Sequence, residues 1–275
     1  MTNNLVILTD LDGTLLDRNS FQPGPALKHL DECNRLKIPV VFVSGKSKAE
    51  IESIRKELHN ESPFISENGG GLYIPVEQFP DLKGFSRDDK YWRWGADVSI
   101  DEMRKALFDI AAETGVKAKC FFEMSDEEAA KCTGLDLHRA KLAKQRDFDE
   151  PFILDNPPPD FIVVLRDEIN KRGYRYTTGG QLHHIMGNFD KGHTVVLLKN
   201  IYFQVNPQMK FAALGDAYND LEMLKQVDYP FLVRQANSSY AAEIVFDGLT
   251  ITNGTGPSGF AEAVGSLIER FNPAV

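Results

Sequence analysis

The sequence predicts an α/β protein in which a parallel β-sheet is covered by helices on both faces and a second α/β domain is inserted into the first. Two observations support this fold class. Short, wholly apolar segments alternate with amphipathic segments over residues 5–66, and the same alternation returns from residue 210 onward. Strands that are apolar at every position are typical of parallel sheets that are buried on both faces.

The first part of the sheet is predicted at the start of the chain. We expect strands at 5–8, 39–43 and 63–66, and helices at 25–36 and 48–58. The strand segments are apolar throughout, whereas the helical segments repeat apolar side chains at every third or fourth position. This order of elements predicts two β-α-β units whose strands lie parallel in one sheet.

The second part of the sheet is predicted near the end of the chain. We expect strands at 210–214 and 229–233, a helix that begins at Asp220, and a closing helix that begins near Pro257. Proline is favoured in the first turn of a helix, because the amide hydrogen that it lacks would have no partner there.

The segment between these two parts has a different texture, and we interpret it as an inserted α/β cap domain. Its predicted elements are helices at about 99–114, 125–131 and 135–146, another helix after the proline-rich stretch NPPPD, and short strands near residues 152, 174 and 182. We therefore predict a discontinuous core domain of residues 1–82 and 186–275, and a cap domain of residues 83–185.

Composition and charge exclude several classes of protein. A formal net charge of −9 over 275 residues argues against a nucleic-acid partner, which would need a basic surface. No apolar run reaches the ~18 residues of a membrane span, and the start of the chain lacks a signal-peptide pattern. Cys33, Cys120 and Cys132 form no C-x-x-C pair, so we expect free thiols. We expect a cytoplasmic protein that binds neither nucleic acid nor membranes.

Two aspartates, Asp10 and Asp12, follow the first predicted strand in the segment DLDGT. Residues i and i+2 of an extended chain point the same way, and two nearby carboxylates repel unless a proton or a cation lies between them. The later segment GDAYND adds Asp216 and Asp220 after another strand. The carboxyl ends of parallel strands meet at one edge of a sheet, so these oxygens predict a cation site that suits Mg²⁺.

An alternative interpretation makes Asp10 and Asp12 simple turn and helix-capping residues. It is disfavoured because a serine at a strand end, a lysine and an acidic cluster follow in order. Another pattern, GKS at 45–47, is not a phosphate-binding P-loop, because Val40 stands where that motif requires glycine.

Four ordered motifs resemble those of the haloacid dehalogenase superfamily of phosphatases. They are DLDGT, Ser44 in VFVSGKS, Lys191 in DKG, and GDAYND. The match spans the whole chain, and it implies a Rossmann-like parallel-sheet core, the haloacid dehalogenase fold, with the inserted segment as its cap. An aspartate at position 12, rather than an apolar residue, favours a phosphatase or phosphomutase over a dehalogenase.

The resemblance also implies a role for each motif residue. Asp10 would be the nucleophile that forms an aspartyl-phosphate, and Asp12 would protonate the leaving oxygen and later activate water. The implied ligands of Mg²⁺ are Asp10, the backbone carbonyl of Asp12, and Asp216, with Asp220 in support. The implied phosphoryl-binding residues are Ser44, Lys191 and Asn219.

Three further segments are similar to the mannosyl-3-phosphoglycerate phosphatase family: SENGGGLYIP, EEAAKCTGLDLHRAKLAKQRDFDEPF and TTGGQLHHIMGNFDKGHTVV. Residues 146–150 stand where that family shows an R-E-Y-S-E run. The implied substrate contacts are Gly45, Glu67, Asn68 and Gly69 from the core, and Arg146, Glu150, Gly180, Gln181 and His184 from the cap. An arginine suits the carboxylate of a glycerate group, whereas sugar hydroxyls suit carboxylate or amide acceptors.

Two features depart from related sequences. Gln181 and Leu182 replace an arginine and an aromatic residue of the last cap strand of the family, and Lys46 stands where related sugar phosphatases commonly have arginine, although the mannosyl family tolerates lysine there. If the missing arginine binds the glycerate group in the family, its loss leaves undetermined which group replaces glycerate in the substrate of this chain.

The function that the sequence predicts is hydrolysis of a phosphomonoester with Mg²⁺ as cofactor. By resemblance, the substrate is mannosyl-3-phosphoglycerate or its glucosyl analogue, and the product is a glycosylglycerate, a compatible solute. The alternatives are a broad sugar-phosphate or phosphoglycolate phosphatase, a phosphomannomutase, and a non-catalytic protein that keeps the fold. The last would be expected to lose the aspartates that this chain retains. The oligomeric state stays open.

Overall fold

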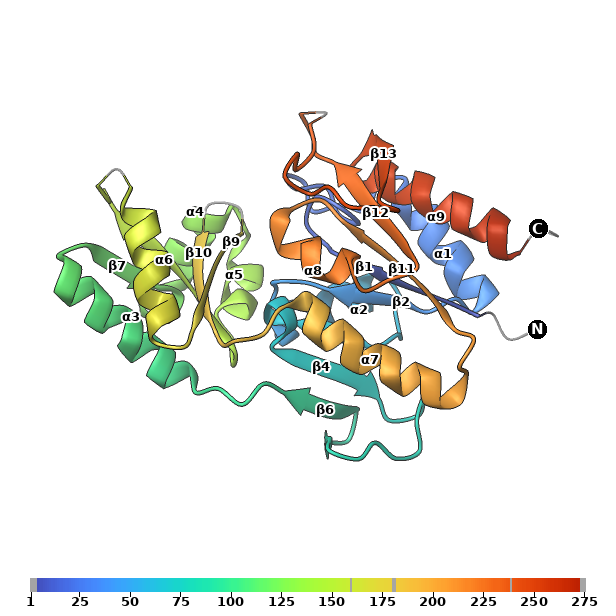
Figure 1. Cartoon of the computed structure of the whole chain (residues 1–275), viewed down its shortest axis with the longest axis horizontal. Helices are drawn as coiled ribbons and strands as arrows, with labels where there is room; N and C mark the ends of the chain where they lie inside the picture. Colours follow the sequence, from blue (N-terminus) through green and yellow to red (C-terminus); the bar gives the residue numbers. More distant parts are fainter. Residues whose placement is uncertain (1–3, 159, 180–181, 238, 273–275) are drawn as a thin grey trace.

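The computed structural model contains two β-sheets that lie side by side (Figure 1). It describes residues 4–158, 160–179, 182–237 and 239–272, so the predicted contacts Gly180 and Gln181 lie outside the described residues. The larger sheet has nine strands in the order β13-β12-β11-β1-β2-β3-β4-β6-β5, and the smaller has four in the order β7-β8-β10-β9. The start of β1 and the end of α9 lie at the end of the large sheet that is remote from the small one (Figure 1).

Six consecutive strands of the large sheet, from the edge strand β13 to β3, are parallel, as predicted for a buried α/β sheet. They are β1 (Leu5–Thr9), β2 (Val40–Val43), β3 (Phe64–Ser66), β11 (Lys210–Gly215), β12 (Tyr229–Arg234) and β13 (Thr250–Thr255). Alternate residues of β1 face opposite cores: Leu5 and Ile7 belong to one apolar cluster, and Val6 and Leu8 to the other. Burial on both faces explains why the first four positions of the strand, Leu5 to Leu8, are all apolar.

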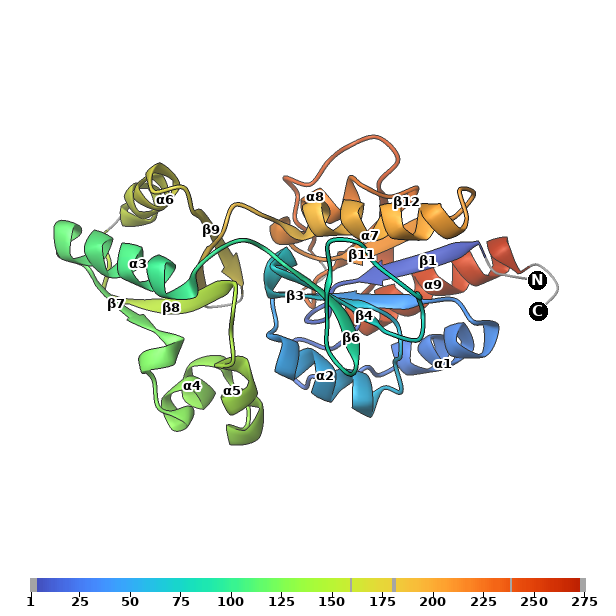
Figure 2. The same ribbon diagram turned by 90° about the horizontal axis from the view of Figure 1, so that it is seen from below.

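Helices cover both faces of the large sheet. On one face lie α1 (Ala26–Leu36), α2 (Lys48–Glu57) and α9 (Pro257–Phe271), and on the other α7 (Lys191–Val205) and the short α8 (Leu221–Leu224). Figure 2 shows α1 and α2 on the opposite side of the sheet from α7 and α8. The start of α2 is fixed by Ser47, whose side chain accepts the backbone N–H of Glu50 while the Glu50 carboxylate accepts the N–H of Ser47.

The small sheet is antiparallel and carries a pair of helices on each face. Its strands are β7 (Lys117–Cys120), β8 (Asp149–Asp155), β9 (Arg175–Gly179) and β10 (Leu182–Met186). One face packs against α3 (Ile100–Thr114) and α6 (Phe161–Lys171), and the other against α4 (Asp126–Thr133) and α5 (Leu137–Ala143). This small sheet and its four helices are called the cap below.

The chain leaves the large sheet later than the predicted boundary at residue 83. Three strands extend that sheet beyond β3: β4 (Gly71–Pro75), β5 (Ser86–Arg87) and β6 (Tyr91–Gly95). They are antiparallel to one another, and β4 is antiparallel to β3. Residues 83–95 therefore belong to the core sheet, and the cap begins after Gly95. The sequence shows little sign of this extension, because β5 is a short, exposed edge strand, β6 is only partly buried, and both carry charged side chains.

The three cysteines agree with the sequence-based expectation. Cys33 and Cys120 are buried, Cys132 is half-buried, and all three are free thiols. Across the described residues, no helix combines the length and apolar character needed to cross a membrane.

Candidate active site

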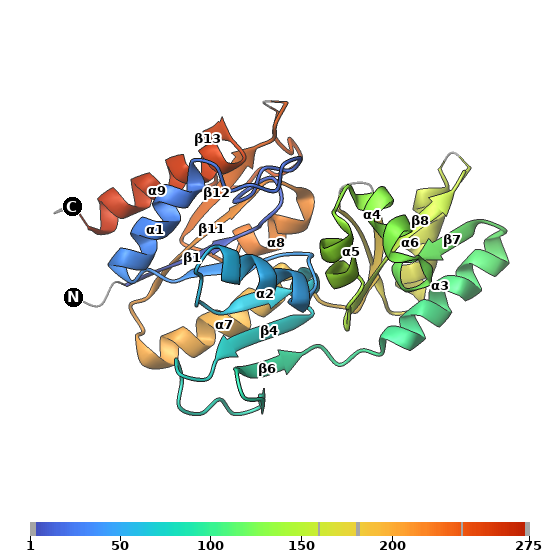
Figure 3. The same ribbon diagram turned by 180° about the vertical axis from the view of Figure 1, so that it is seen from behind.

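A cavity of about 570 Å³ lies between the carboxyl ends of the large sheet's parallel strands and the cap. Both domains line it: Asp10, Ser44 and Asn219 come from the core, and Arg146 and His184 from the cap. Figure 3 shows α2 of the core beside α5 of the cap at this junction. A cavity of this size is typical of small-molecule sites.

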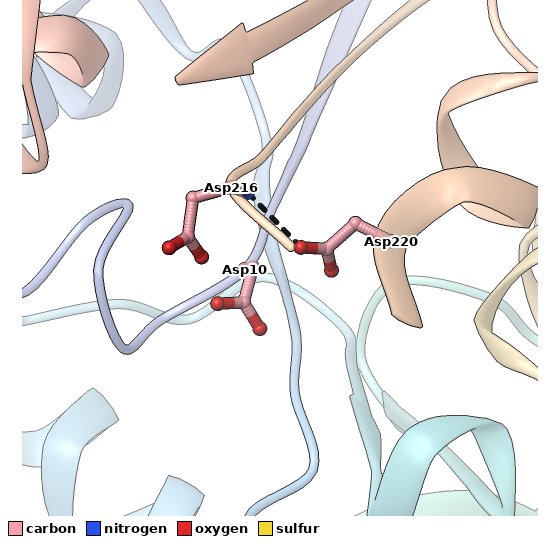
Figure 4. A group of neighbouring side chains, drawn as sticks. All are labelled: Asp10, Asp216 and Asp220. Atoms are coloured by element: carbon pink, nitrogen blue, oxygen red, sulfur yellow. Dashed lines mark hydrogen bonds between the residues drawn. The ribbon is translucent and has the colours of Figure 1, made fainter. Parts of the chain in front are cut away.

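Three aspartates converge at the floor of the cavity, as the motifs predict. Asp10 follows β1, and Asp216 and Asp220 follow β11, the strand next to it. Carboxylate oxygens of these three residues all lie within 4.8 Å of one another, and all three side chains are buried (Figure 4). Pairing of β1 with β11 therefore brings together residues that are more than two hundred positions apart in the chain.

Lys191, the first residue of α7, supplies the positive charge at the centre of this cluster. Its Nζ lies 2.7 Å from Oδ1 of Asp10 and 2.6 Å from Oδ1 of Asp220. The lysine is almost completely buried, at 1% exposure. The side chain of Asp190 caps the helix by accepting the N–H of His193, which fixes the position from which Lys191 extends.

Negative charge exceeds positive charge among these four groups, and the pKa values reflect it. Burial raises the pKa of Asp10 to about 7, with contributions from Asp220 and Asp216, although Lys191 opposes the shift. Burial and Asp220 likewise raise the pKa of Asp216 to about 6. Burial lowers the pKa of Lys191, but the attraction of Asp10 and Asp220 outweighs it, so that this pKa is raised. The cluster thus favours an additional cation.

Asp220 serves mainly to shape the loop after β11. Its Oδ2 accepts the backbone N–H groups of Asp216 (3.0 Å) and Ala217 (3.1 Å), and its Oδ1 accepts from Lys191. Figure 4 shows the bond between the Asp216 backbone and Asp220. With both oxygens occupied, Asp220 lies behind the cavity and supports its two neighbours.

Arg18, which the motifs did not indicate, contacts two of the oxygens that are implied as metal ligands. Its Nη2 lies 2.7 Å from Oδ2 of Asp216 and 3.1 Å from the backbone carbonyl oxygen of Asp12. A positively charged nitrogen thus bridges two of the oxygens implied as metal ligands. The other oxygen of Asp216, Oδ1, is buried and has no hydrogen-bond partner among the described residues. Asp10, the Asp12 carbonyl and Asp216 therefore fit a hard divalent cation.

Asp12 faces the cavity from the turn after β1 and is held by Lys46. The Lys46 ammonium lies 2.7 Å from Oδ2 of Asp12 and 3.7 Å from Glu50. Burial lowers the pKa of Lys46, but Asp12 and Glu50 outweigh this effect and the pKa is raised. The ammonium therefore stays charged and fixes the Asp12 side chain. We noted Lys46 in the sequence only as a departure from arginine, and its pairing with Asp12 depends on the tertiary structure.

Ser44 and Asn219 flank the aspartates. Ser44 ends β2, is buried, and accepts the N–H of Lys46 at 3.2 Å. Asn219 donates from Nδ2 to Oδ1 of Asn68 at 3.3 Å. The backbone of Gly45 passes close to Asn68, because a Cβ at that position would lie 3.1 Å from the Asn68 amide. The predicted core residues Ser44, Gly45, Asn68 and Asn219 all line the cavity.

Glu67 and Gly69 do not line the cavity, unlike the other predicted core contacts. Glu67 is fully buried, and its Oε2 accepts three backbone N–H groups of the cap, from residues 147, 148 and 149, at 3.0, 2.7 and 3.1 Å. Gly69 has φ +108°, and a Cβ there would lie 2.3 Å from the carbonyl oxygen of Asp190. Both residues therefore fix how the core packs against the cap and the start of α7.

Arg146 lines the cavity, but its guanidinium is already occupied by the protein. It donates to the carbonyl oxygen of Gly45 at 2.6 Å, to the Asp149 carbonyl at 3.0 Å, and to Oδ1 of Asp149 at 2.7 Å. We had placed it on a helix at 135–146, but α5 ends at Ala143 and Arg146 lies in the turn that follows. Arg146 therefore joins the cap to the core, and its guanidinium is not free to form a two-pronged hydrogen bond with a substrate carboxylate.

Glu150 is not placed to contact a bound molecule. It is 1% exposed, does not line the cavity, and lies 2.8 Å from Nε and 2.7 Å from Nη2 of Arg104. It also accepts the N–H of Phe122. Successive residues of a strand point to opposite sides, so Glu150 faces away from the side to which its neighbour Asp149 points.

Two cap residues that line or support the cavity are not among the site residues that the sequence predicts. Lys131, in the last turn of α4, lines the cavity and is exposed. Asp149 lies behind the lining and contacts both Arg146 and His184. A charged side chain at the start of the apolar strand DEPFIL was a signal for Asp149, whereas nothing distinguished Lys131 from other surface lysines.

Comparisons with known proteins agree with this geometry. A family model described as haloacid dehalogenase-like hydrolase matches residues 7–81 and 160–250. A glucosyl-3-phosphoglycerate/mannosyl-3-phosphoglycerate phosphatase of Methanococcoides burtonii is 39% identical over 97% of this chain and 98% of its own length. A mannosyl-3-phosphoglycerate phosphatase of Pyrococcus furiosus is 35% identical over 83% of this chain and 90% of its own length.

A solved structure shows the same fold at low sequence identity. A putative hydrolase of this class from Plasmodium vivax is 15% identical, with a TM-score of 0.71 over 98% of this chain and 97% of its own. The family model covers more than half of the chain, and both phosphatases exceed 30% identity over most of it. The chain therefore belongs to the haloacid dehalogenase-like hydrolases, within the family of the mannosyl-3-phosphoglycerate phosphatases.

Proposed function

We propose that this phosphatase hydrolyses glucosyl-3-phosphoglycerate and mannosyl-3-phosphoglycerate with Mg²⁺ as cofactor, in the cytoplasm. The observation that carries the proposal is the excess of buried carboxylates, Asp10, Asp216 and Asp220, around Lys191 at the floor of a cavity shared with the cap. The names of the two relatives supply the substrate class.

Asp10 is the proposed nucleophile. Its carboxylate attacks phosphorus and forms an aspartyl-phosphate, while the bond from phosphorus to the glycerate oxygen breaks. Asp12 gives its proton to that leaving oxygen. In the second half of the reaction Asp12 takes a proton from water, which then hydrolyses the aspartyl-phosphate and restores Asp10. Lys46 supports these steps by holding Asp12 toward the cavity at 2.7 Å.

Asp10, the Asp12 carbonyl and Asp216 are the residues that would hold Mg²⁺. When bound there, the ion supplies positive charge that offsets the repulsion between the Asp10 carboxylate and the phosphoryl group. The raised pKa values of Asp10 and Asp216 support this assignment, because burial and the neighbouring carboxylates disfavour the charged forms and a bound cation would favour them.

The remaining motif residues are proposed to bind the phosphoryl oxygens. Lys191 is held between Asp10 and Asp220, and Ser44 and Asn219 present a hydroxyl and an amide to the cavity. Fixed donors of this kind stabilise charge on the transferring group without having to reorganise during the reaction. Asp220 contributes by orienting Lys191.

The cap is proposed to bind the sugar and the glycerate. Arg146 is occupied by Asp149 and Gly45, so another cation must meet the glycerate carboxylate. Lys131 suits this task, because it lines the cavity and has no ion-pair partner among the described residues. His184, on β10 of the cap sheet, also lines the cavity and is the proposed contact for a sugar hydroxyl.

The test is release of inorganic phosphate from a panel of esters, with Mg²⁺ and again with EDTA. The panel holds both glycosyl-3-phosphoglycerates, mannose 6-phosphate, 3-phosphoglycerate and phosphoglycolate. We expect strong preference for the glycosyl esters, loss of activity in EDTA, and recovery when Mg²⁺ is added back. Equal, weak activity on every ester would contradict the proposed substrate, and full activity in EDTA would contradict the proposed cofactor.

A further inference from the structure

Asp149 is a fully buried carboxylate that contacts three side chains of the cavity wall at once. Its Oδ1 lies 2.7 Å from Nη2 of Arg146, its Oδ2 accepts from Nδ2 of Asn68 at 2.8 Å, and both oxygens lie 3.1 Å from Nδ1 of His184. Asp149 itself does not line the cavity, whereas Arg146, Asn68 and His184 do.

The charge on Asp149 is stable, so it can act only as an acceptor. Burial raises its pKa, but the Arg146 guanidinium and His184 outweigh burial and hold the pKa at about 2. An ionised carboxylate has no hydrogen to donate. Each of its three partners must therefore present a donor, which determines the orientation of the Asn68 amide and the site of the proton on the His184 ring.

For His184 the consequence is a fixed tautomer. Because Nδ1 faces two carboxylate oxygens, it carries the hydrogen, and in the neutral ring Nε2 is then an acceptor. Nε2 has no hydrogen-bond partner in the part of the chain that the structure describes, and it is not among the side-chain atoms sealed from solvent. The ring lines the cavity, so this open acceptor is available to a bound molecule.

Arg146 supplies Asp149 with a positive charge that does not depend on the protonation of His184. Its guanidinium already compensates the Asp149 carboxylate at 2.7 Å, so the neutral imidazole can occupy the same site. The cavity side of the ring then accepts a hydrogen and does not offer one, which selects a hydroxyl over an anionic group. Two further hydrogen bonds, from Asn219 to Asn68 and from Asn68 to Asp149, continue this alternation of donors and acceptors into the core.

We propose that Asp149 is a positioning residue that holds His184 in its Nδ1-protonated form, so that Nε2 accepts a hydrogen bond from a substrate hydroxyl. This rests on the proposed function in that the hydroxyl belongs to the glycosyl group of the substrate.

The first arm of the test is ¹⁵N NMR of the full chain near pH 8, without substrate. Six histidines give separate ring signals, and His184 is identified by the signal that disappears in His184→Asn. We expect protonated Nδ1 and unprotonated Nε2 in the wild type. In Asp149→Asn, whose amide can donate as well as accept, we expect a mixture of tautomers. A wild-type ring protonated on Nε2 would overturn the proposal.

The second arm compares KM with kcat on the preferred glycosyl ester and on an aryl phosphate without a sugar. For Asp149→Asn and His184→Asn we expect KM to rise roughly three- to tenfold on the glycosyl ester, the value of one hydrogen bond. We expect kcat to stay within about twofold, and KM for the aryl phosphate to be unchanged. His184→Asn keeps a donor toward Asp149, so it decides the matter if Asp149→Asn does not fold.

Glu150→Gln is the matched control. It alters a buried, arginine-paired carboxylate on the same strand, but one that contacts no side chain of the cavity wall. The His184 signal and KM should both be unchanged in this variant. An equal rise of KM in Glu150→Gln, or no rise in the two test variants, would overturn the proposal.

The two proposals fail in distinguishable ways. A wild-type enzyme that ignores both glycosyl esters contradicts the proposed function, but the NMR arm does not depend on substrate and mannose 6-phosphate can replace the ester in the kinetic arm. A wild type that prefers the glycosyl esters, with KM unaffected by Asp149→Asn and His184→Asn, contradicts only the role of Asp149.

Discussion

At the ends of β1 and β11, three buried carboxylates are met by two cations: the Lys191 ammonium pairs with Asp10 and Asp220, and the partly exposed Arg18 guanidinium pairs with Asp216. At the start of β8, by contrast, one buried carboxylate is shared by a guanidinium, an imidazole and an amide. The pKa values move in opposite directions: that of Asp10 is raised to about 7, and that of Asp149 is lowered to about 2. The first group has too little positive charge, and the second has all the partners it needs.

This contrast separates a reacting centre from a scaffold. Unneutralised carboxylates cost stability, so they persist where a cation and a reacting group complete them. A carboxylate with every oxygen satisfied holds its neighbours in place and has no capacity left for a ligand. The comparison also explains why Arg146 and Glu150, which resemblance placed in the substrate site, do not serve as free substrate contacts.

The largest expected effect is on the reacting centre. Asp10→Asn removes the nucleophile, and we expect kcat on a glycosyl ester to fall by roughly 10⁴-fold or more. Circular dichroism serves as the control for folding. Turnover near the wild-type rate in a folded Asp10→Asn protein would rule out the aspartyl-phosphate.

Asp12→Asn tests the neighbouring carboxylate, which the geometry holds toward the cavity through Lys46. Without a proton donor the leaving glycerate oxygen departs slowly, so we expect kcat to fall by roughly 10²–10⁴. The phenolate of an aryl phosphate departs without a proton donor, so formation of the aspartyl-phosphate from an aryl phosphate should be slowed much less. Equal losses on the two substrates, measured in the pre-steady state, would speak against the acid role.

Stability measurements in metal-free buffer sharpen the comparison, because the two clusters should respond oppositely. The folded pKa of Asp149 is depressed from 3.8 to about 2, so its contribution is present above about pH 4 and is lost as pH falls toward 2. This amounts to about 2 kcal/mol of the free energy of unfolding. Asp149→Asn should lose that amount at pH 7, and urea unfolding at pH 7 and pH 3 would show the difference shrinking.

For Asp10 the sign is reversed. Its folded pKa is raised from 3.8 to about 7, so the stability that it contributes is full below about pH 4 and is lost as pH rises through 7. Without Mg²⁺, Asp10→Asn should therefore be at least as stable as the wild type at pH 8. A lower Tm for this variant at pH 8 would show that the pair with Lys191 outweighs the repulsion.

The smallest expected effect on activity comes from the scaffold. Glu150→Gln leaves Arg104 without its buried partner, and we expect a loss of about 1–3 kcal/mol in the free energy of unfolding. KM for the glycosyl ester should stay within about twofold. A selective rise in KM without loss of stability would restore Glu150 as a substrate contact.

The elements that the sequence predicted best are those buried on both sides. β1, β2 and β3 and the helices α1 and α2 lie within a residue or two of their predicted bounds, because apolar runs and helical periodicity report burial directly. β7, with the sequence KAKC, and β13, with TITNGT, were missed. Their side chains are largely polar and partly exposed, and they form strands through pairing with a neighbour.

Within the site, the sequence by itself indicated that Asp10, Asp12, Ser44 and Asp216 lie at one edge of the sheet, because strand ends can be recognised locally and the carboxyl ends of parallel strands meet at one edge. The family resemblance added Lys191. Which oxygens of the site accept hydrogen bonds from the protein depends on the tertiary structure. Arg18 reaches Asp216, Arg146 reaches Gly45, and Glu67 accepts from three cap amides, in each case across many residues of sequence. Such contacts arise only when distant segments of the chain fold together, since a hydrogen bond requires partners within about 3 Å that no spacing in the sequence specifies.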